Sequence, residues 1–150
     1  MRAVIQRVSN CELKINGEIF SSISNGLLVL LGIEDADNHE DIDWLCGKIC
    51  RLRIFDDENG VMNLSVTDVN AEIMVVSQFT LFASTKKGNR PSYIRASKPE
   101  IAIPLYNEFV EKIKSESNLK VATGVFGENM DISFTNNGPV TIIIDSKYRE

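Results

Sequence analysis

The chain has 150 residues, of which 43% are hydrophobic and 25% are charged, and its formal net charge is −5. This length and composition fit one globular domain, residues 1–150, that buries a core without disulfides or metals. No apolar run approaches the roughly 18 residues of a membrane span, so we expect no membrane association and a cytoplasmic location. The acidic balance argues against a general nucleic-acid binder and against DNA as a partner.

The first third of the chain predicts antiparallel strands. RAVIQRV forms one strand, CELKI and EIFSSI form a hairpin around Asn16-Gly17, and GLLVLLGI adds a buried strand. Asn38 or Asp37 can then cap a helix. Its apolar residues recur every three or four positions, and the pattern ends near Leu52.

The rest of the chain predicts a turn at Asp57–Gly60, a long apolar strand AEIMVVSQFTLF and a second helix. Ser97 with Glu100 resembles a capping box for that helix. Pro104 lies inside the helical pattern, so the helix either begins late or is kinked there. More strands close the chain, with Asn136-Asn137-Gly138-Pro139 as a turn between two of them. The expected class is α+β, with mostly antiparallel β-sheets forming a barrel-like core and two principal helices.

Three cysteines and one histidine limit the metal chemistry of the chain. Cys11, Cys46 and Cys50 cannot all pair, and we expect buried, reduced thiols. A zinc site needs several ligands at defined spacing, and His39 is the only histidine. We therefore expect no metal and no cofactor.

The stretch KKGNRPSYIRASK, residues 86–98, contains five basic residues and no acidic residue. Such a stretch can meet a phosphate backbone, although a charged surface loop explains it equally well. The candidate phosphate contacts are Lys86, Lys87, Arg90 and Arg95.

The long apolar strand ends in four residues that can form a polar site, Ser77, Gln78, Phe79 and Thr80. Polar side chains and backbone N–H groups at a strand end can orient a carbonyl or stabilise an oxyanion, or they can satisfy nearby backbone. A serine or threonine nucleophile needs a base, and His39 lies in an acidic, exposed segment. A polar pocket without a base suits a substrate with its own hydroxyl, such as an aminoacyl ester on the terminal ribose of tRNA.

At this point the chain resembles the D-aminoacyl-tRNA deacylases over essentially its whole length. SQFTL and NGPVT, in the family's order and separation, make the resemblance specific. The matching pieces are IQRV at 5–8, GLLVLLG at 26–32, RIF at 53–55, MNLSV at 62–66, VVSQFTL at 75–81, GNRPS at 88–92, LYNEFV at 105–110, GVFG at 124–127 and NGPVT at 137–141.

The resemblance implies an editing enzyme that hydrolyses D-aminoacyl-tRNA and glycyl-tRNA(Ala). It implies a homodimer with active sites at the interface, where the strand Ser77–Leu81 lines the pocket and Gly138-Pro139 enters from the other subunit. The family's Gly–Pro bond is cis, whereas sequence alone predicts trans. Its carbonyls leave no room for an L side chain, so many D-amino acids and glycine are accepted.

The resemblance also assigns supporting roles. Arg7 holds the Gly–Pro turn, Ala102 lies beside the pocket, and Phe79 packs near the terminal adenosine or in the core. The 2′-OH of the tRNA assists catalysis, Thr80 orients or supports, and the basic stretch is a candidate tRNA contact. The chain departs from the family pattern at four positions, Tyr93, Pro104, Glu128 and Asn137.

Two alternatives to this reading remain open. The first has the same substrate class with Thr80 as a covalent nucleophile. The second is a non-catalytic tRNA-binding dimeric module. Only the basic stretch and the lack of catalytic motifs support it.

Overall fold

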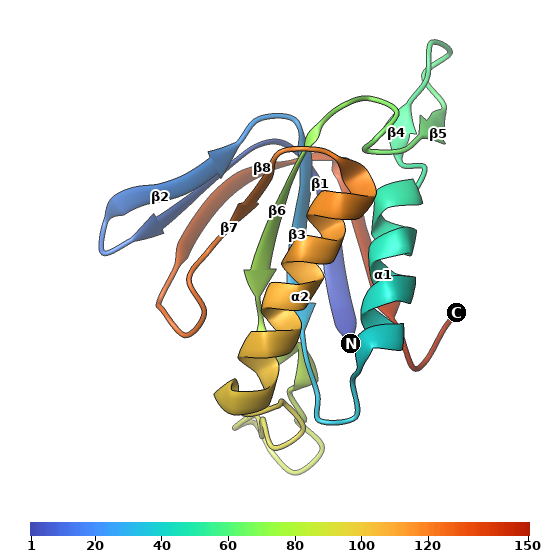
Figure 1. The fold of residues 1–150 in the computed structure, drawn as a ribbon. Helices are drawn as coiled ribbons and strands as arrows, with labels where there is room; N and C mark the ends of the chain where they lie inside the picture. Colours follow the sequence, from blue (N-terminus) through green and yellow to red (C-terminus); the bar gives the residue numbers. More distant parts are fainter.

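One strongly curved sheet carries two helices on one of its faces (Figure 1). The computed structural model describes all 150 residues. The strand order is β2-β1-β3-β6-β7, and β8 pairs with β1. The α+β class, with a barrel-like sheet and two principal helices, is confirmed. The strands of this sheet are β1 (Arg2–Ile15), β2 (Glu18–Ile23), β3 (Gly26–Gly32), β6 (Glu72–Ser77), β7 (Val121–Thr123) and β8 (Asp131–Asp145).

The strand β1 organises the antiparallel part of the sheet. It pairs antiparallel with β2, β3 and β8, and it runs through the Ser9-Asn10 break that separates the two strands expected there. The predicted hairpin turn is present, with positive φ angles of 51° at Asn16 and 80° at Gly17. The other pairs, β3–β6 and β6–β7, are parallel because a helix returns the chain to the same end of the sheet each time.

The helix α1 (His39–Arg51) begins and ends as its sequence predicts. The side chain of Asn38 accepts from the N–H of Glu40, and the Asp41 carboxylate accepts from the N–H of Asn38 at 3.0 Å. These contacts satisfy N–H groups that have no partner inside the helix. A short hairpin follows, β4 (Phe55–Asp56) and β5 (Met62–Leu64), with the turn predicted at Asp57–Gly60.

The helix α2 (Pro99–Ser117) differs from expectation at its start. Lys98 is the N-cap and makes no side-chain cap, while the Ser97 hydroxyl donates to Asp35 at 2.6 Å, so the predicted capping box is wrong. The helix begins before Pro104 and continues through it, so it does not start late. Pro104 is exposed, and solvent can satisfy the carbonyl that the missing N–H leaves free. Neither helix is long and apolar enough to cross a membrane.

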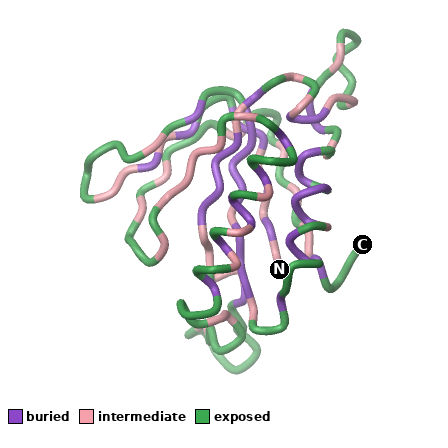
Figure 2. The backbone as a smooth tube through the Cα atoms, in the orientation of Figure 1, coloured by how far each residue is buried: buried purple, intermediate pink, exposed green.

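Buried residues form two clusters, and Figure 2 shows buried positions in purple along the central strands and α1. The larger cluster fills the space between the sheet and the two helices, and alternate residues of β1 and β3, including Ala3, Ile5 and Val29, point into it. A smaller cluster with Leu28, Met74 and Val76 lies inside the curve of the sheet. The hydroxyl of Ser21 in β2 donates to the carbonyl of Thr123 in β7 at 2.7 Å, which draws the two ends of the sheet together.

The Asn136–Pro139 segment is not the turn between two strands that the sequence predicts. It lies within β8, which pairs with β1 on both sides of it. Val8 faces Asn136 and Gln6 faces Thr141, so residues 137–140 bulge outward opposite the single residue Arg7. The Asn136 side chain accepts from the N–H of Val140 at 3.1 Å and donates to Thr141 at 3.0 Å, which closes the bulge at its base. The turn-forming residues therefore produce a bulge, because β1 supplies a pairing partner before and after them.

Candidate functional site

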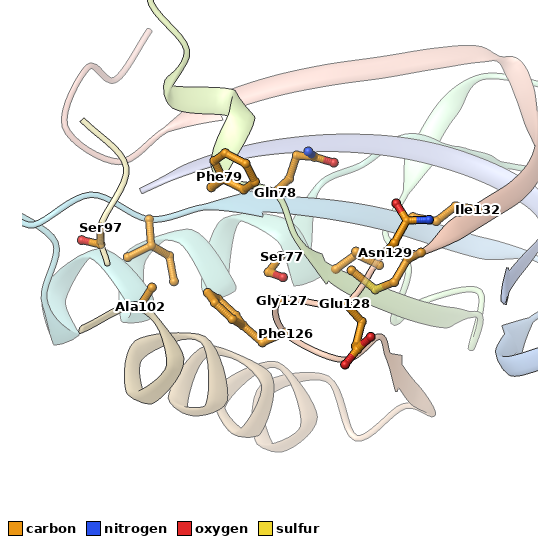
Figure 3. A pocket seen from close by; sticks show the side chains of 13 residues that line it. Ser77, Gln78, Phe79, Ser97, Ala102, Phe126, Gly127, Glu128, Asn129 and Ile132 are labelled. Carbon is orange, nitrogen blue, oxygen red and sulfur yellow. The ribbon is translucent and has the colours of Figure 1, made fainter. Parts of the chain in front are cut away.

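A pocket of about 280 Å³ lies at the carboxyl ends of the parallel strands β3 and β6 (Figure 3). Carboxyl ends of parallel strands meet at one edge of a sheet, where side chains from several segments converge. The pocket is bounded by β6, by the start of α2, by the segment 126–130 and by β8. Its lining residues are Ile33, Val76, Ser77, Gln78, Phe79, Ser97, Ala102, Phe126, Gly127, Glu128, Asn129, Met130 and Ile132.

The predicted strand AEIMVVSQFTLF, residues 71–82, ends earlier than expected. β6 stops at Ser77, and Phe79–Phe82 form a short 3₁₀-helix after Gln78. The N–H of Gln78 still bonds to the carbonyl of Leu31 at 2.7 Å. Phe79 and Thr80 are the first two residues of this short helix. The first N–H groups of a helix have no acceptor inside it, so the N–H groups of these two residues can donate to another group.

Three of the four candidate residues at the strand end line the pocket, and Thr80 does not. Ser77, Gln78 and Phe79 line it, whereas Thr80 lines a neighbouring groove with Val4 and Ile143. The Thr80 hydroxyl accepts a hydrogen bond from the Gln78 side chain at 2.6 Å. An amide donor orients this hydroxyl and cannot take its proton.

Phe79 lies at the mouth of the pocket and not in the core. Its exposed fraction is 56%, and its ring packs edge-on against Tyr93 with centroids 5.0 Å apart. The core alternative for Phe79 is therefore wrong. The pair joins the end of β6 to the basic loop, residues 86–98.

The deeper wall is apolar and rests on α2. Ala102 is 4% exposed and lines the pocket from the first turns of that helix. Phe126 packs edge-on against Tyr106 at 6.0 Å, and the Tyr106 hydroxyl donates to the carbonyl of Val75 at 2.8 Å. Burial raises the pKa of Tyr106 to about 12, so this hydroxyl stays a donor. The wall is thus anchored to the same strand that ends in Ser77.

The segment 124–130 contributes lining residues that the sequence did not single out, notably Met130. A Cβ on Gly124 would lie 2.3 Å from the Met130 sulfur, so the side chain of Met130 packs directly over that glycine. The only signal for this wall was the GVFG piece of the family resemblance, in which Phe126 lies.

The pocket lining contains one ionisable side chain, that of Glu128. Glu128 is exposed, and in Figure 3 its carboxylate points away from Ser77. His39 does not line the pocket and so cannot act there as a base. Its side chain is 79% exposed and pairs with Glu108 on α2, and this pairing raises the pKa of His39. No group of three or more metal-ligating side chains is present. The site therefore has oriented amides and hydroxyls but no pair of nucleophile and base.

The Gly138-Pro139 segment does not line the pocket of its own chain. Both residues are exposed, Gly138 has a φ of 129°, and the peptide bond between them is cis. Arg7 is buried behind the bulge, with an exposed fraction of 7%, and its Nε donates to the carbonyl of Asn137 at 3.1 Å.

The basic loop lies beside the pocket mouth. Lys86, Lys87 and Arg90 are exposed and make no ion pair, while Arg95 pairs with Glu34 at 3.1 Å and lies over the Phe82 ring. Three cations are thus free to contact a ligand, and the fourth is engaged within the protein.

The three cysteines are free and buried, as predicted. Burial raises the pKa of Cys11 and of Cys50 to about 11, and it raises that of Cys46 as well. None of them lines the pocket.

Comparisons with known proteins cover nearly the whole chain. A family model described as D-Tyr-tRNA(Tyr) deacylase matches residues 4–145. Relatives named D-aminoacyl-tRNA deacylase from Flavobacterium psychrophilum and Parabacteroides distasonis are 63% and 61% identical over 150 residues, which is 100% of each chain.

Two solved structures share the fold. One, named c-Myc DNA Unwinding Element Binding Protein, has a TM-score of 0.92 and 39% identity over 97% of this chain and 98% of that chain. The other, described as a probable eukaryotic D-amino acid tRNA deacylase, has a TM-score of 0.81 over 95% of this chain and 97% of that chain. Its identity is 17%, so it speaks for the fold alone.

Proposed function

Because the chain belongs to the D-Tyr-tRNA(Tyr) deacylase family, whose members are hydrolases of an ester bond, we propose that it edits D-aminoacyl-tRNA by substrate-assisted hydrolysis in the pocket at the end of β6. One observation carries the mechanism. The pocket presents Ser77 and Gln78, and the carboxylate of its one ionisable side chain, Glu128, points away from Ser77. The activating group therefore comes from the substrate.

The proposed reaction uses the 2′-OH of the terminal ribose. Water attacks the ester carbonyl carbon, and the bond from that carbon to the ribose 3′-oxygen breaks, which releases a D-amino acid and tRNA. The ribose hydroxyl relays the proton from the water to the leaving oxygen. The N–H group of Phe79, a pocket-lining residue, stabilises the oxyanion, because it leads a 3₁₀-helix and has no acceptor inside it.

We propose that the active unit is a homodimer, with Gly138 and Pro139 of one subunit completing the pocket of the other. The bulge that carries them is exposed and is absent from its own pocket lining. An apolar face lies next to it, where Val4 faces Ile143 across the sheet and Ile143 is 68% exposed. A second subunit on this face would cover Ile143 and bring the bulge to the neighbouring site.

The bulge then acts by exclusion. Backbone carbonyls placed beside the α-carbon of the substrate leave no space for an L side chain and make no demand on a D side chain. The same filter admits glycine, which has no side chain, so glycyl-tRNA(Ala) is a second proposed substrate.

The tRNA is proposed to approach over the basic loop. Lys86, Lys87 and Arg90 are unpaired, and they belong to the loop whose Tyr93 packs against Phe79 at the pocket mouth. Arg95 is a weaker candidate, because Glu34 already neutralises it. Cations at this one place can attract a phosphate backbone to a protein with a net charge of −5. A tRNA substrate fits the cytoplasm as the proposed location.

The experiment compares D-tyrosyl-tRNA and L-tyrosyl-tRNA with the purified protein. Loss of the D-ester with retention of the L-ester is the expected result, and equal loss of both would refute chiral editing. A tRNA ending in 2′-deoxyadenosine tests the mechanism, since it should remain charged. Sedimentation of the same preparation tests the dimer.

A further inference from the structure

The side chain of Arg7 joins the bulge of β8 to the hairpin of β4 and β5. Its Nε donates to the carbonyl of Asn137 in the bulge at 3.1 Å. On the other side, its Nη1 donates to the carbonyl of Ile54 at 2.7 Å and lies 3.3 Å from the Asp56 carboxylate. The guanidinium therefore has one acceptor in the bulge, one in the hairpin at Asp56, and one at Ile54, the residue just before the hairpin.

Space around the guanidinium is limited where it meets Gly138. A Cβ at that position would lie 3.0 Å from Nη2 of Arg7 and 2.9 Å from a methyl group of Val140. The planar group thus packs directly against the backbone of the bulge. A rotation of the Arg7 side chain would change the support of Asn137 and Gly138 together.

The hairpin that carries Asp56 is internally braced. The Asp57 carboxylate accepts from the N–H groups of Asn59 at 2.9 Å and Val61 at 3.1 Å, and these hydrogen bonds lower its pKa. Phe55 is buried, with an exposed fraction of 5%, and it ties the hairpin to the main core. The Asp56 carboxylate that faces Arg7 therefore lies on a hairpin that is hydrogen-bonded within its turn and packed against the core.

Asp56 is the one carboxylate that pairs with Arg7. Its side chain is 52% exposed, whereas that of Arg7 is 9% exposed. Such a half-exposed ion pair adds little to folding stability, but it restricts where a buried guanidinium can point. We infer that Asp56 is a positioning residue for chiral selection, which holds Arg7 against the Asn137–Gly138 backbone so that the bulge keeps the shape that excludes L side chains. This inference rests on the proposed role of Gly138 and Pro139.

The test compares Asp56→Asn with a matched control, Glu58→Gln. Both changes remove one negative charge from the same hairpin, and Glu58 makes no ion pair with Arg7. Rates of D- and L-tyrosyl-tRNA deacylation are measured on the full-length protein, with thermal unfolding alongside. We expect Asp56→Asn to raise the ratio of the L rate to the D rate about three- to tenfold, with an unfolding midpoint close to that of the unchanged protein. Asp56→Glu should restore selectivity, and Glu58→Gln should match the unchanged protein.

A double-mutant cycle with Arg7→Gln shows whether Asp56 acts through Arg7. Once Arg7 is lost, the further change Asp56→Asn should leave the L-to-D ratio unaltered. If Asp56→Asn has the same ratio of L rate to D rate as Glu58→Gln, the inference is wrong. In that case the proposed function still stands, provided that the unchanged protein hydrolyses the D-ester faster than the L-ester. Equal D and L rates in the unchanged protein would remove both.

Discussion

The side-chain nitrogen Nε2 of Gln78 donates a hydrogen bond to the hydroxyl oxygen of Thr80 at 2.6 Å. This hydrogen bond orients the Thr80 hydroxyl. Thr80 is also absent from the residues that line the pocket. A covalent threonine nucleophile needs a base within reach of its proton, and an amide donor cannot serve as one. The alternative with Thr80 as nucleophile thus has no support from the geometry.

The first prediction concerns this hydroxyl. Thr80→Val removes it and keeps the shape, so D-tyrosyl-tRNA deacylation should stay within about tenfold of the unchanged enzyme, since only an orienting hydrogen bond is lost. Removal of a true nucleophile costs roughly a millionfold in comparable hydrolases. Single-turnover rates separate the two cases, and a loss beyond about a thousandfold would reinstate Thr80 as the nucleophile.

The second prediction concerns the wall at Ala102. Because this residue is buried and lines the pocket, the larger side chain of Ala102→Leu must occupy substrate space or displace Phe126. We expect D-ester hydrolysis to fall at least about tenfold, and the free energy of unfolding to fall by about 1–3 kcal/mol. Ile103→Leu is the control, because Ile103 is exposed and absent from the lining. Equal rates for the two variants would show that the substrate does not use this wall.

The third prediction concerns the basic loop. Replacing Lys86, Lys87 and Arg90 together by glutamine should raise KM for charged tRNA and leave kcat nearly unchanged, because none of these cations lines the pocket. The slope of log KM against log salt should flatten by about two to three units if all three contact phosphates. Lys114→Gln is the control, since Lys114 lies near the far end of α2 and pairs with Glu111. An unchanged salt slope would place the tRNA elsewhere.

The fourth prediction concerns acid stability at Asp41. Burial alone would raise the pKa of this carboxyl, but hydrogen bonds from Lys147 and Ser146 outweigh burial and lower it below its usual value of 3.8. A lowered folded-state pKa adds stability that is complete above pH 3.8 and is lost as the pH falls through the folded value. Asp41→Asn should therefore cost about 1–3 kcal/mol at pH 6, and this cost should shrink toward pH 2. Urea unfolding of both proteins across this range measures the difference, and a cost independent of pH would contradict the prediction.

The fifth prediction concerns the cysteines. Burial raises the pKa of Cys11 and of Cys50 to about 11, so neither thiol forms a thiolate near neutral pH. We expect a thiol reagent to modify none of the three cysteines in the folded protein at pH 7.5 over minutes, and all three in urea. Rapid labelling of the folded protein would show that the core around them opens.

Local chemistry determined much of the secondary structure. Asn38 capped its helix as expected, because the cap depends on residues three positions apart. Asn16-Gly17 formed the predicted hairpin turn, which is also a local effect, because both residues accept positive φ angles. Ser97 does not cap its helix, because its hydroxyl donates a hydrogen bond to Asp35, which is distant in sequence. A short-range pattern cannot report such a competing partner.

The sequence by itself determined the α+β class, the two helices and the residue types that could form a site. Only the tertiary structure decided that Asn137–Val140 is a bulge opposite Arg7, that Thr80 lies outside the pocket, and that Phe79 is exposed. The physical reason is pairing over long separations: Arg7 and Asn137 are 130 positions apart, and neither has a neighbour in sequence that reveals the other. The shape of the site depends on the register between β1 and β8, which is set when the whole sheet forms.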